Sequence, residues 1–305
     1  MYNKILVALD GSELSETILP YARAFAQALK IPVELLQVID PETLMPSVIA
    51  HQGRYDDLMT AERKHGDEYL KRLASSFASA ASVGCSLEIG RPAEVIVDRA
   101  AAQAGTLITM TTHGYSGLKR WLLGSVAEKV LEAAKSDLLV VRAAAEGRKA
   151  QGVSLKRVIV PLDGSELAEI AIPHAVELAK AMALEIILAR AFSLPPLAYN
   201  PEGYTPNLEE LWSQLGKEAE EYLDARLRQI KGQGLEKVSA LSAQGPAADK
   251  IIEVARQKPE SLIAMSTHGR SGVGRWVLGS VAERVVRYSD DPVLIVRATS
   301  ARAAS

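Results

Sequence analysis

The feature that most constrains this chain is an internal repeat. A segment of 19 residues that begins at Thr112 recurs at Thr267, 155 residues further on, with 14 identical positions and no gap. A repeat at a fixed offset means that one structural unit occurs twice. The 305 residues suit two domains of about 150 residues each. We therefore predict domains at residues 1–143 and 155–298, a linker at 144–154 and a flexible tail at 299–305.

Within each half, short apolar runs alternate with amphipathic segments. Such alternation predicts a parallel sheet with helices on both faces. We therefore predict the α/β class, with two tandem, doubly wound, five-stranded parallel sheets that are Rossmann-like. Pro20 interrupts the first amphipathic segment, so we expect a kink or a late helix start there. Strands are expected at 5–9, 33–39, 84–89, 106–110 and 137–142, then at 157–162, 184–191, 238–241, 262–265 and 292–297, with long helices at 57–82 and 208–233.

The repeated segment lies between an expected strand and an expected helix start. Gly114, Gly117 and Gly124 allow tight turns and the close approach of a ligand. We expect Ser125 to cap the next helix, whose first N–H groups and dipole favour an anion. Two basic residues in the segment add positive charge. Together these features point to phosphate, and the alternative is a tight strand-to-helix loop with a good cap.

Asp10 follows the first expected strand, and Gly114 follows the fourth. Ligands of doubly wound sheets bind outside the carboxyl ends of strands, where the strand order reverses. If these two strands are neighbours, both loops border one crevice, with Val38 at its rim. Asp10 and its counterpart Asp163 either bind the ligand or only cap an Asp-Gly-Ser turn. Their recurrence favours the ligand.

Composition narrows the classes of protein. A net charge of −2 argues against a nucleic-acid surface. The single cysteine, Cys85, cannot form a disulfide within the chain, and we expect it to be buried in a strand. There is no signal peptide and no apolar run of membrane-spanning length. We therefore expect a cytoplasmic protein with no nucleic-acid partner and no membrane partner.

No hydrolytic machinery stands out in the sequence. A nucleophile elbow, a metal-ligand cluster and a Walker lysine are all missing. His113 and His268 are candidate bases, although a structural role within the loop is the preferred interpretation. We predict no catalytic residue and no protein metal site, and hence a binding protein with at most slow turnover.

Three motifs together resemble the universal stress protein family. They are Asp-Gly-Ser at 10–12, Val-Ile-Asp at 38–40, and a His-Gly followed by nine residues and Gly-Ser. The resemblance covers almost the whole chain, and the two copies look like the tandem-domain members of the family. Its nucleotide-binding members carry Gly-x-x-Gly, nine residues, then Gly and Ser or Thr. Both copies depart at the first glycine, which is Thr111 in one and Ser266 in the other.

The resemblance implies a binding site in each copy. In the first, Asp10 would contact the ribose, while Ala8 and Val38 would line the adenine. The second pocket differs, because Ala191 stands at the Val38 position, next to Arg190 and Phe192. The remaining positions implied near the phosphates or ribose are Thr111, His113, Gly114, Gly124, Ser125 and Val126, then Asp163, Gly269, Gly279, Ser280 and Val281.

The function implied by the resemblance is ATP binding by a stress-response or signalling protein. Mg²⁺ can accompany ATP through phosphates and water. Two alternatives stay open. One is an interaction module of the same fold without nucleotide, suggested by the missing first glycine. The other is a slow nucleotide hydrolase or phospho-transfer enzyme.

The last strand of each half is apolar and would be an exposed edge if it stood alone. We therefore predict that the halves pack as a pseudo-two-fold pair, as the resemblance also implies. The sequence leaves open whether two chains form a homodimer and which protein partners they have.

Overall fold

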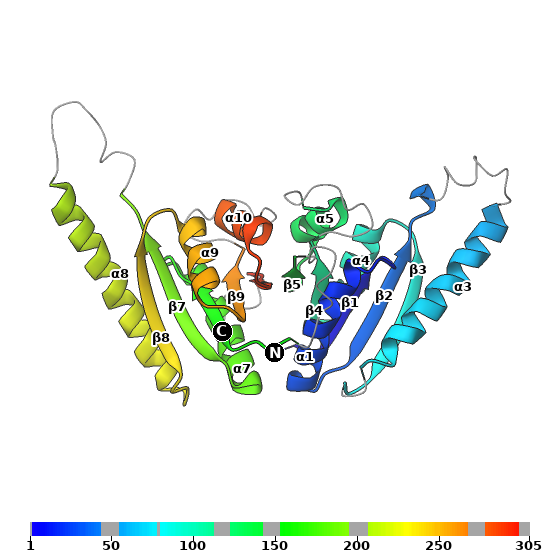
Figure 1. Ribbon diagram of the computed structural model, residues 1–305, viewed down its shortest axis with the longest axis horizontal. Coiled ribbons are helices and arrows are strands. Elements are labelled where there is room, and N and C mark those ends of the chain that lie inside the picture. Colours follow the sequence, from blue (N-terminus) through cyan, green and yellow to red (C-terminus); the bar gives the residue numbers. More distant parts are fainter. Residues whose placement is uncertain are drawn as a thin grey trace, which may run out of the picture. The chain divides into compact units, whose positions relative to one another are not determined.

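The structure is a computed structural model that describes residues 2–43, 55–77, 80–112, 123–142, 153–194, 207–267 and 278–298. It divides into two compact units, Met1–Val153 and Ser154–Ser305 (Figure 1). Most of the predicted linker and all of the predicted tail lie outside the described residues, so the exact domain limits stay a prediction.

Unit 1 is a parallel five-stranded sheet with helices on both faces. Its strand order is β3-β2-β1-β4-β5. The strands are β1 (Lys4–Leu9), β2 (Val33–Ile39), β3 (Val83–Ile89), β4 (Thr106–Thr111) and β5 (Leu138–Val141). The helices are the 3-10 helix η1 (Ser15–Ile18), α1 (Leu19–Leu29), α3 (Tyr55–Ala74), α4 (Pro92–Ala101) and α5 (Ser125–Ala133).

Unit 2 repeats this arrangement with the strand order β8-β7-β6-β9-β10. Figure 1 shows its long helix α8 running along β7 and β8. The strands are β6 (Arg157–Pro161), β7 (Glu185–Phe192), β8 (Val238–Gln244), β9 (Ser261–Ser266) and β10 (Val293–Val296). The helices are α6 (Glu166–Glu169), α7 (Ala171–Met182), α8 (Leu208–Lys231), α9 (Ala247–Gln257) and α10 (Ser280–Tyr288).

The pairing of the central strands shows the switch point, which is where the strand order reverses. Ile5 of β1 pairs with Val33 of β2 on one side and with Leu107 of β4 on the other. The chain therefore leaves β1 in one direction and later returns to its other side. This reversal between β1 and β4, repeated between β6 and β9, confirms the predicted doubly wound α/β class.

Side-chain contacts show which helices share a face of the sheet. In unit 1, Arg23 of α1 donates to Ser76, just after α3, at 2.9 Å, so α1 and α3 lie on one face. Helices α4 and α5 pack together on the other face. In unit 2, Arg284 of α10 pairs with Asp249 of α9 at 2.8 Å. Both faces of the central strands are covered, which explains their continuous apolar runs.

The structure tests three local predictions. The late helix start is confirmed, since α1 begins at Leu19 with Pro20 in its first turn, where no N–H is needed. The first long helix was expected to reach residue 82, but it ends at Ala74. There the hydroxyls of Ser75 and Ser76 donate hydrogen bonds to the carbonyls of Arg72 and Leu73, in competition with further helical bonds. The expectation that Cys85 is buried is wrong, because Cys85 is exposed on the edge strand β3.

Candidate functional site

A tight turn follows β1 and presents an exposed carboxylate. Oδ1 of Asp10 accepts hydrogen bonds from the Ser12 amide at 3.0 Å and the Ser12 hydroxyl at 2.6 Å. Gly11 between them has φ +86°, a conformation that side chains rarely adopt. The Ser12 hydroxyl in turn accepts from the Ser15 amide at 3.1 Å. The sequence Asp-Gly-Ser therefore closes this turn locally, with the Ser15 amide as a further donor.

The turn after β6 is built in the same way. Oδ1 of Asp163 accepts from the Ser165 amide at 2.9 Å and the Ser165 hydroxyl at 2.6 Å, and Gly164 has φ +90°. The Ser165 hydroxyl also accepts from the Ala168 amide at 3.1 Å and so caps α6. Both aspartates therefore stabilise their turns, each through hydrogen bonds that Oδ1 accepts.

The two ends of each glycine-rich loop are tied together. In unit 1 the Gly124 amide donates to the Thr112 carbonyl at 2.8 Å, directly after β4. In unit 2 the Gly279 amide donates to the Thr267 carbonyl, also at 2.8 Å. Each loop therefore leaves and returns at the carboxyl end of the strand beside β1 or β6. This places each helix start at the switch point.

The starts of α5 and α10 differ from the expectation in one respect. Ser125 was expected to cap α5, but Gly124 is the N-cap and no side chain caps the helix. Gly124 is extended, with φ −63° and ψ 145°, which makes Ser125 the first helical residue. Gly279 and Ser280 take the same places at α10. The expectation failed because the extended residue, and not the hydroxyl residue, decides where a helix begins.

The missing side-chain cap leaves backbone donors at each helix start. The first intrahelical bond runs from the Glu128 amide to the Gly124 carbonyl at 2.9 Å. The amides of Ser125, Val126 and Ala127 therefore have no acceptor within the helix. Ser280 and Val281 begin α10 in the same way. Both helices thus offer N–H groups and the positive end of a dipole to an anion.

The register sorts the remaining predicted residues by face. Ala8 pairs with Leu36, and Leu6 pairs with Glu34, whose carboxylate contacts α4. Ala8 and Val38 therefore lie together on the α4 face of the sheet. Thr111 lies two residues after Thr109, which pairs with Val7, so it belongs to the opposite face. Thr111 is only 5% exposed and ends β4, as the 6% exposed Ser266 ends β9.

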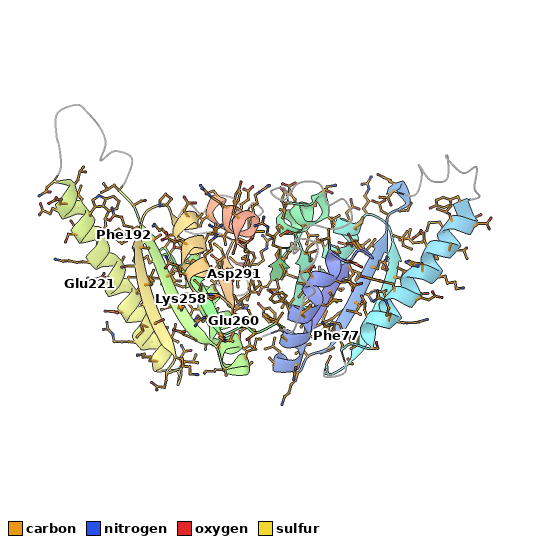
Figure 2. All side chains as sticks on the ribbon, in the orientation of Figure 1. Phe77, Phe192, Glu221, Lys258, Glu260 and Asp291 are labelled. Carbon is orange, nitrogen blue, oxygen red and sulfur yellow. The ribbon has the colours of Figure 1, made fainter. Side chains whose placement is uncertain are left out.

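The end of β7 shows how the second pocket differs from the first. Phe192 meets Trp212 of α8 edge to face, with ring centroids 6.0 Å apart. Figure 2 labels Phe192 beside α8. The guanidinium of Arg190 lies 4.7 Å from the ring centroid of Tyr222, also on α8. Because side chains alternate along a strand, Ala191 points to the other face. The large neighbours of Ala191 therefore lie behind the pocket and do not line it.

Two residues behind the Asp10 turn were missed by the sequence reasoning. Gln37 of β2 lies under Gly11, and Tyr69 of α3 is near enough for Asp10 to act on its pKa. A signal was available, because Tyr69 and Tyr222 are separated by 153 residues, the same offset as Asp10 and Asp163.

Other predicted residues cannot be placed. His113, Gly114, His268 and Gly269 lie outside the described residues, so their roles stay predictions. Within the part of the chain that the structure describes, no group of three or more His, Cys, Asp or Glu side chains could hold a metal ion. No helix of that part is long and apolar enough to cross a membrane.

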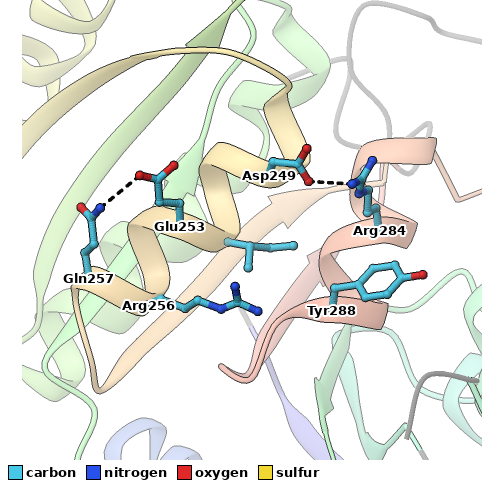
Figure 3. Close-up of a pocket in the computed structure, with 7 residues that line it drawn as sticks. Asp249, Glu253, Arg256, Gln257, Arg284 and Tyr288 are labelled. Carbon is cyan, nitrogen blue, oxygen red and sulfur yellow. Dashed lines mark hydrogen bonds and ion pairs between the residues drawn. The ribbon is translucent and has the colours of Figure 1, made fainter. Parts of the chain in front are cut away.

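A groove of about 500 Å³ lies away from the strand ends, between α9 and α10 of unit 2 (Figure 3). Asp249 and Arg284 pair across it, and Gln257 donates to Glu253 at 3.2 Å. Most of its polar side chains thus bind one another along its walls. We assign this groove no role in ligand binding.

Comparison with known proteins agrees with the duplicated fold. A model of the universal stress protein family matches residues 1–142 and again residues 154–297. A universal stress protein of Mycolicibacterium smegmatis is 24% identical over 301 residues, which cover 96% of each chain. Another, from Methanocaldococcus jannaschii, is 34% identical over 146 residues, 47% of this chain and 82% of that protein.

A solved structure extends the comparison to the whole fold. The crystal structure of a universal stress protein from Archaeoglobus fulgidus has a TM-score of 0.69 and 21% identity, and the match covers 98% of this chain and 97% of that chain. At this identity the match shows the fold alone. The family match itself rests on two segments that span nearly the whole sequence. The chain therefore belongs to the universal stress protein family, as a member with two tandem domains.

Proposed function

We propose that this protein binds adenine nucleotide, ATP above all, at the carboxyl end of the sheet in each unit. The observation that carries the proposal is a duplicated arrangement at the switch point. An Asp-Gly-Ser turn follows the first strand, and an uncapped helix start follows the strand beside it. An acceptor for hydroxyls next to donors for an anion suits a sugar phosphate.

The proposed pose follows from these groups. The phosphates lie at the amides of Ser125 and Val126 in unit 1, or of Ser280 and Val281 in unit 2. Asp10 or Asp163 accepts hydrogen bonds from the ribose hydroxyls. The adenine lies against Ala8 and Val38 in unit 1 and against Ala191 in unit 2. Mg²⁺ would accompany the phosphates through water and phosphate oxygens.

The missing first glycine was the reason to consider an interaction module without nucleotide. The strand register weakens that reason. Thr111 and Ser266 are buried strand residues, and Thr111 belongs to the face opposite Ala8 and Val38. The Thr111 hydroxyl is therefore kept away from the proposed adenine position, and the binding test decides whether ribose and phosphate tolerate it. We therefore favour a nucleotide-binding stress-response or signalling protein over the interaction module, and over a fast enzyme.

The first test is the small-molecule content of freshly purified protein. The protein is denatured, and the released compounds are identified and counted by mass spectrometry. We expect ATP or ADP, with as many as one molecule for each unit. Empty protein that also shows no calorimetric uptake of ATP at about millimolar concentration would exclude the proposal.

A further inference from the structure

The strongest unassigned feature is the polar side chain that supports the Asp10 turn from behind. Gln37 lies on β2, paired with Leu9 of β1 and Leu87 of β3. A Cβ placed on Gly11 would lie 3.3 Å from Gln37 Nε2, and one placed on Gly66 of α3 would lie 3.1 Å from Gln37 Oε1. The amide therefore lies between the turn and the helix, and it shares the space beside Gly66 with the side chain of Leu87, which a Cβ on Gly66 would meet at 2.8 Å.

This placement leaves polar atoms unsatisfied. Gln37 Oε1 is buried without a hydrogen-bond partner, and so is the hydroxyl of Tyr69, one helical turn after Gly66. Burial raises the pKa of Tyr69 to about 12, and the charges of Glu16 and Asp10 add to this. The Ser15 hydroxyl is close enough to act on that pKa, but its geometry falls short of a hydrogen bond.

An unsatisfied buried polar group lowers the stability of the folded state. A methionine of similar shape would fill the place without this cost. A polar group that is kept against its contribution to stability points to a functional requirement. The Oε1 of this amide faces Gly66 of α3, and its Nε2 faces the Asp10 turn.

Unit 2 fills the corresponding space between its second strand and its long helix with different residues. Arg190 takes the place of Gln37, and its guanidinium lies 4.7 Å from the ring centroid of Tyr222. Ala219, fully buried, stands where unit 1 has Gly66 and fills the space that the Gln37 amide needs. The Tyr222 hydroxyl donates to Glu169 of α6 at 2.8 Å, and Glu169 also pairs with Arg226 at 3.0 Å. The tyrosine of unit 2 is therefore satisfied.

We propose that Gln37 is a positioning residue, which holds the Asp10 turn in its ligand-binding geometry and makes unit 1 the tighter of the two nucleotide sites. The inference rests on the proposed function and deepens it. The amide nitrogen lies 3.3 Å from the position of a Cβ on Gly11, and in this role it would limit how far the turn and its carboxylate can move toward the sheet. In the described part of unit 2, Arg190 takes the place of this amide and brings a guanidinium to the end of the sheet where Asp163 lies. A cation there competes with ribose hydroxyls for the carboxylate.

The test measures ATP affinity of unit 1 alone by calorimetry. Gly279→Asp first removes binding at unit 2 by placing a negative charge at the start of α10. In this background, Gln37→Met keeps the shape of the side chain but removes the amide. We expect about tenfold weaker ATP binding, equivalent to about 1.4 kcal/mol. We also expect an unchanged or higher melting temperature, because the unsatisfied oxygen is gone.

A loss of ATP affinity without a loss of melting temperature distinguishes a positioning residue from a residue that only packs. A residue that only fills space would lose affinity together with stability, or lose neither. Gln37→Arg, which introduces the residue of unit 2, is expected to weaken binding at least as much as Gln37→Met. In the Gly124→Asp background, the pair Arg190→Gln with Ala219→Gly is expected to tighten binding at unit 2.

The outcomes distinguish the two proposals. If the wild-type protein takes up ATP with two equal sites, or if Gln37→Met binds as tightly as its background, the positioning role is overturned and nucleotide binding stands. If the wild-type protein takes up no ATP at either unit, the proposed function and this inference fall together.

Discussion

Arg99 of α4 donates its Nε to Oε1 of Glu34 on β2 at 2.8 Å, and so ties the helix to the strand beneath it. Ser86 of β3 donates to the same oxygen at 2.6 Å, and Lys4 of β1 pairs with the other oxygen. Glu34 is 6% exposed. Burial by itself would raise the pKa of Glu34, but the bonds from Arg99, Lys4 and Ser86 outweigh it and lower the pKa to about 2.

This lowered pKa predicts acid sensitivity in unit 1. The stabilisation is complete above the ordinary pKa of about 4.5 and is lost as the pH falls toward 2, by at most about 3 kcal/mol. Urea unfolding between pH 2 and pH 7 should show a shallower acid limb for Glu34→Gln than for the wild type. The matched control is Glu185→Gln, since Glu185 pairs with Arg157 at 3.2 Å but is far more exposed. Equal pH dependence of wild type and Glu34→Gln would contradict this prediction.

Gly124 allows a test in which stability and binding move in opposite directions. Its extended conformation suits Asp and Asn, which are good N-cap residues, so both variants should stabilise α5 by a few tenths of a kcal/mol. Asp also brings a negative charge to the proposed phosphate position. At an effective dielectric of 20 this costs about 4 kcal/mol at 4 Å.

Calorimetry should therefore show at least tenfold weaker ATP binding for Gly124→Asp, roughly 1.4 kcal/mol or more. Gly124→Asn, equal in size but neutral, is the control and should bind much more tightly than the Asp variant. Equal affinities of the two variants would place the phosphates elsewhere.

Gly11 should tolerate no side chain. Its φ of +86° costs a non-glycine residue about 1–2 kcal/mol. An added Cβ would also lie 3.3 Å from Gln37 Nε2. We expect Gly11→Ala to lower the free energy of unfolding by more than Gly234→Ala, because Gly234 has φ +83° but open space around its Cα. Chemical denaturation of both variants measures the difference, and equal losses would mean that the contact with Gln37 is unimportant.

Asp291, just before β10, should destabilise unit 2 at neutral pH. Burial and the neighbouring Asp290 raise its pKa to about 6, from 3.8. A raised carboxyl pKa favours the protonated folded state, so this contribution is present below pH 3.8 and is lost as the pH rises through 6. Asp291→Asn should therefore gain stability at pH 7, by at most about 3 kcal/mol, and gain nothing near pH 3.5.

Asp137, which directly precedes β5 in unit 1, provides the control for Asp291. Asp137 accepts a hydrogen bond from the Tyr2 hydroxyl at 3.0 Å. Asp137→Asn should therefore bring no gain at pH 7. A thermal-unfolding profile in which Asp291→Asn follows the wild type at every pH would exclude the prediction.

The packing of the two units stays a prediction. The apolar sequences of β5 and β10 favour a pseudo-two-fold pair, in which neither strand remains an exposed edge. Small-angle X-ray scattering should then give one particle with a fixed separation between two lobes. A profile of two lobes that move independently on a linker would contradict it.

The sequence by itself determined the duplication, the fold class and the two turns. Each of these depends on local chemistry. A fixed offset repeats the unit, apolar runs specify buried parallel strands, and Asp10 with Gly11 and Ser12 closes a turn through local hydrogen bonds. For the same reason, Pro20 marked the late start of α1 correctly.

Only the tertiary structure decided the details of the site. Ser125 was the cap expected from sequence, and the structure puts Gly124 there instead, with its amide bonded back to the Thr112 carbonyl. The support of Asp10 by Gln37 depends on how closely α3 approaches β2 at Gly66. Such contacts join residues far apart in the chain, and no pattern of spacing encodes the distance between a strand and the helix that packs on it.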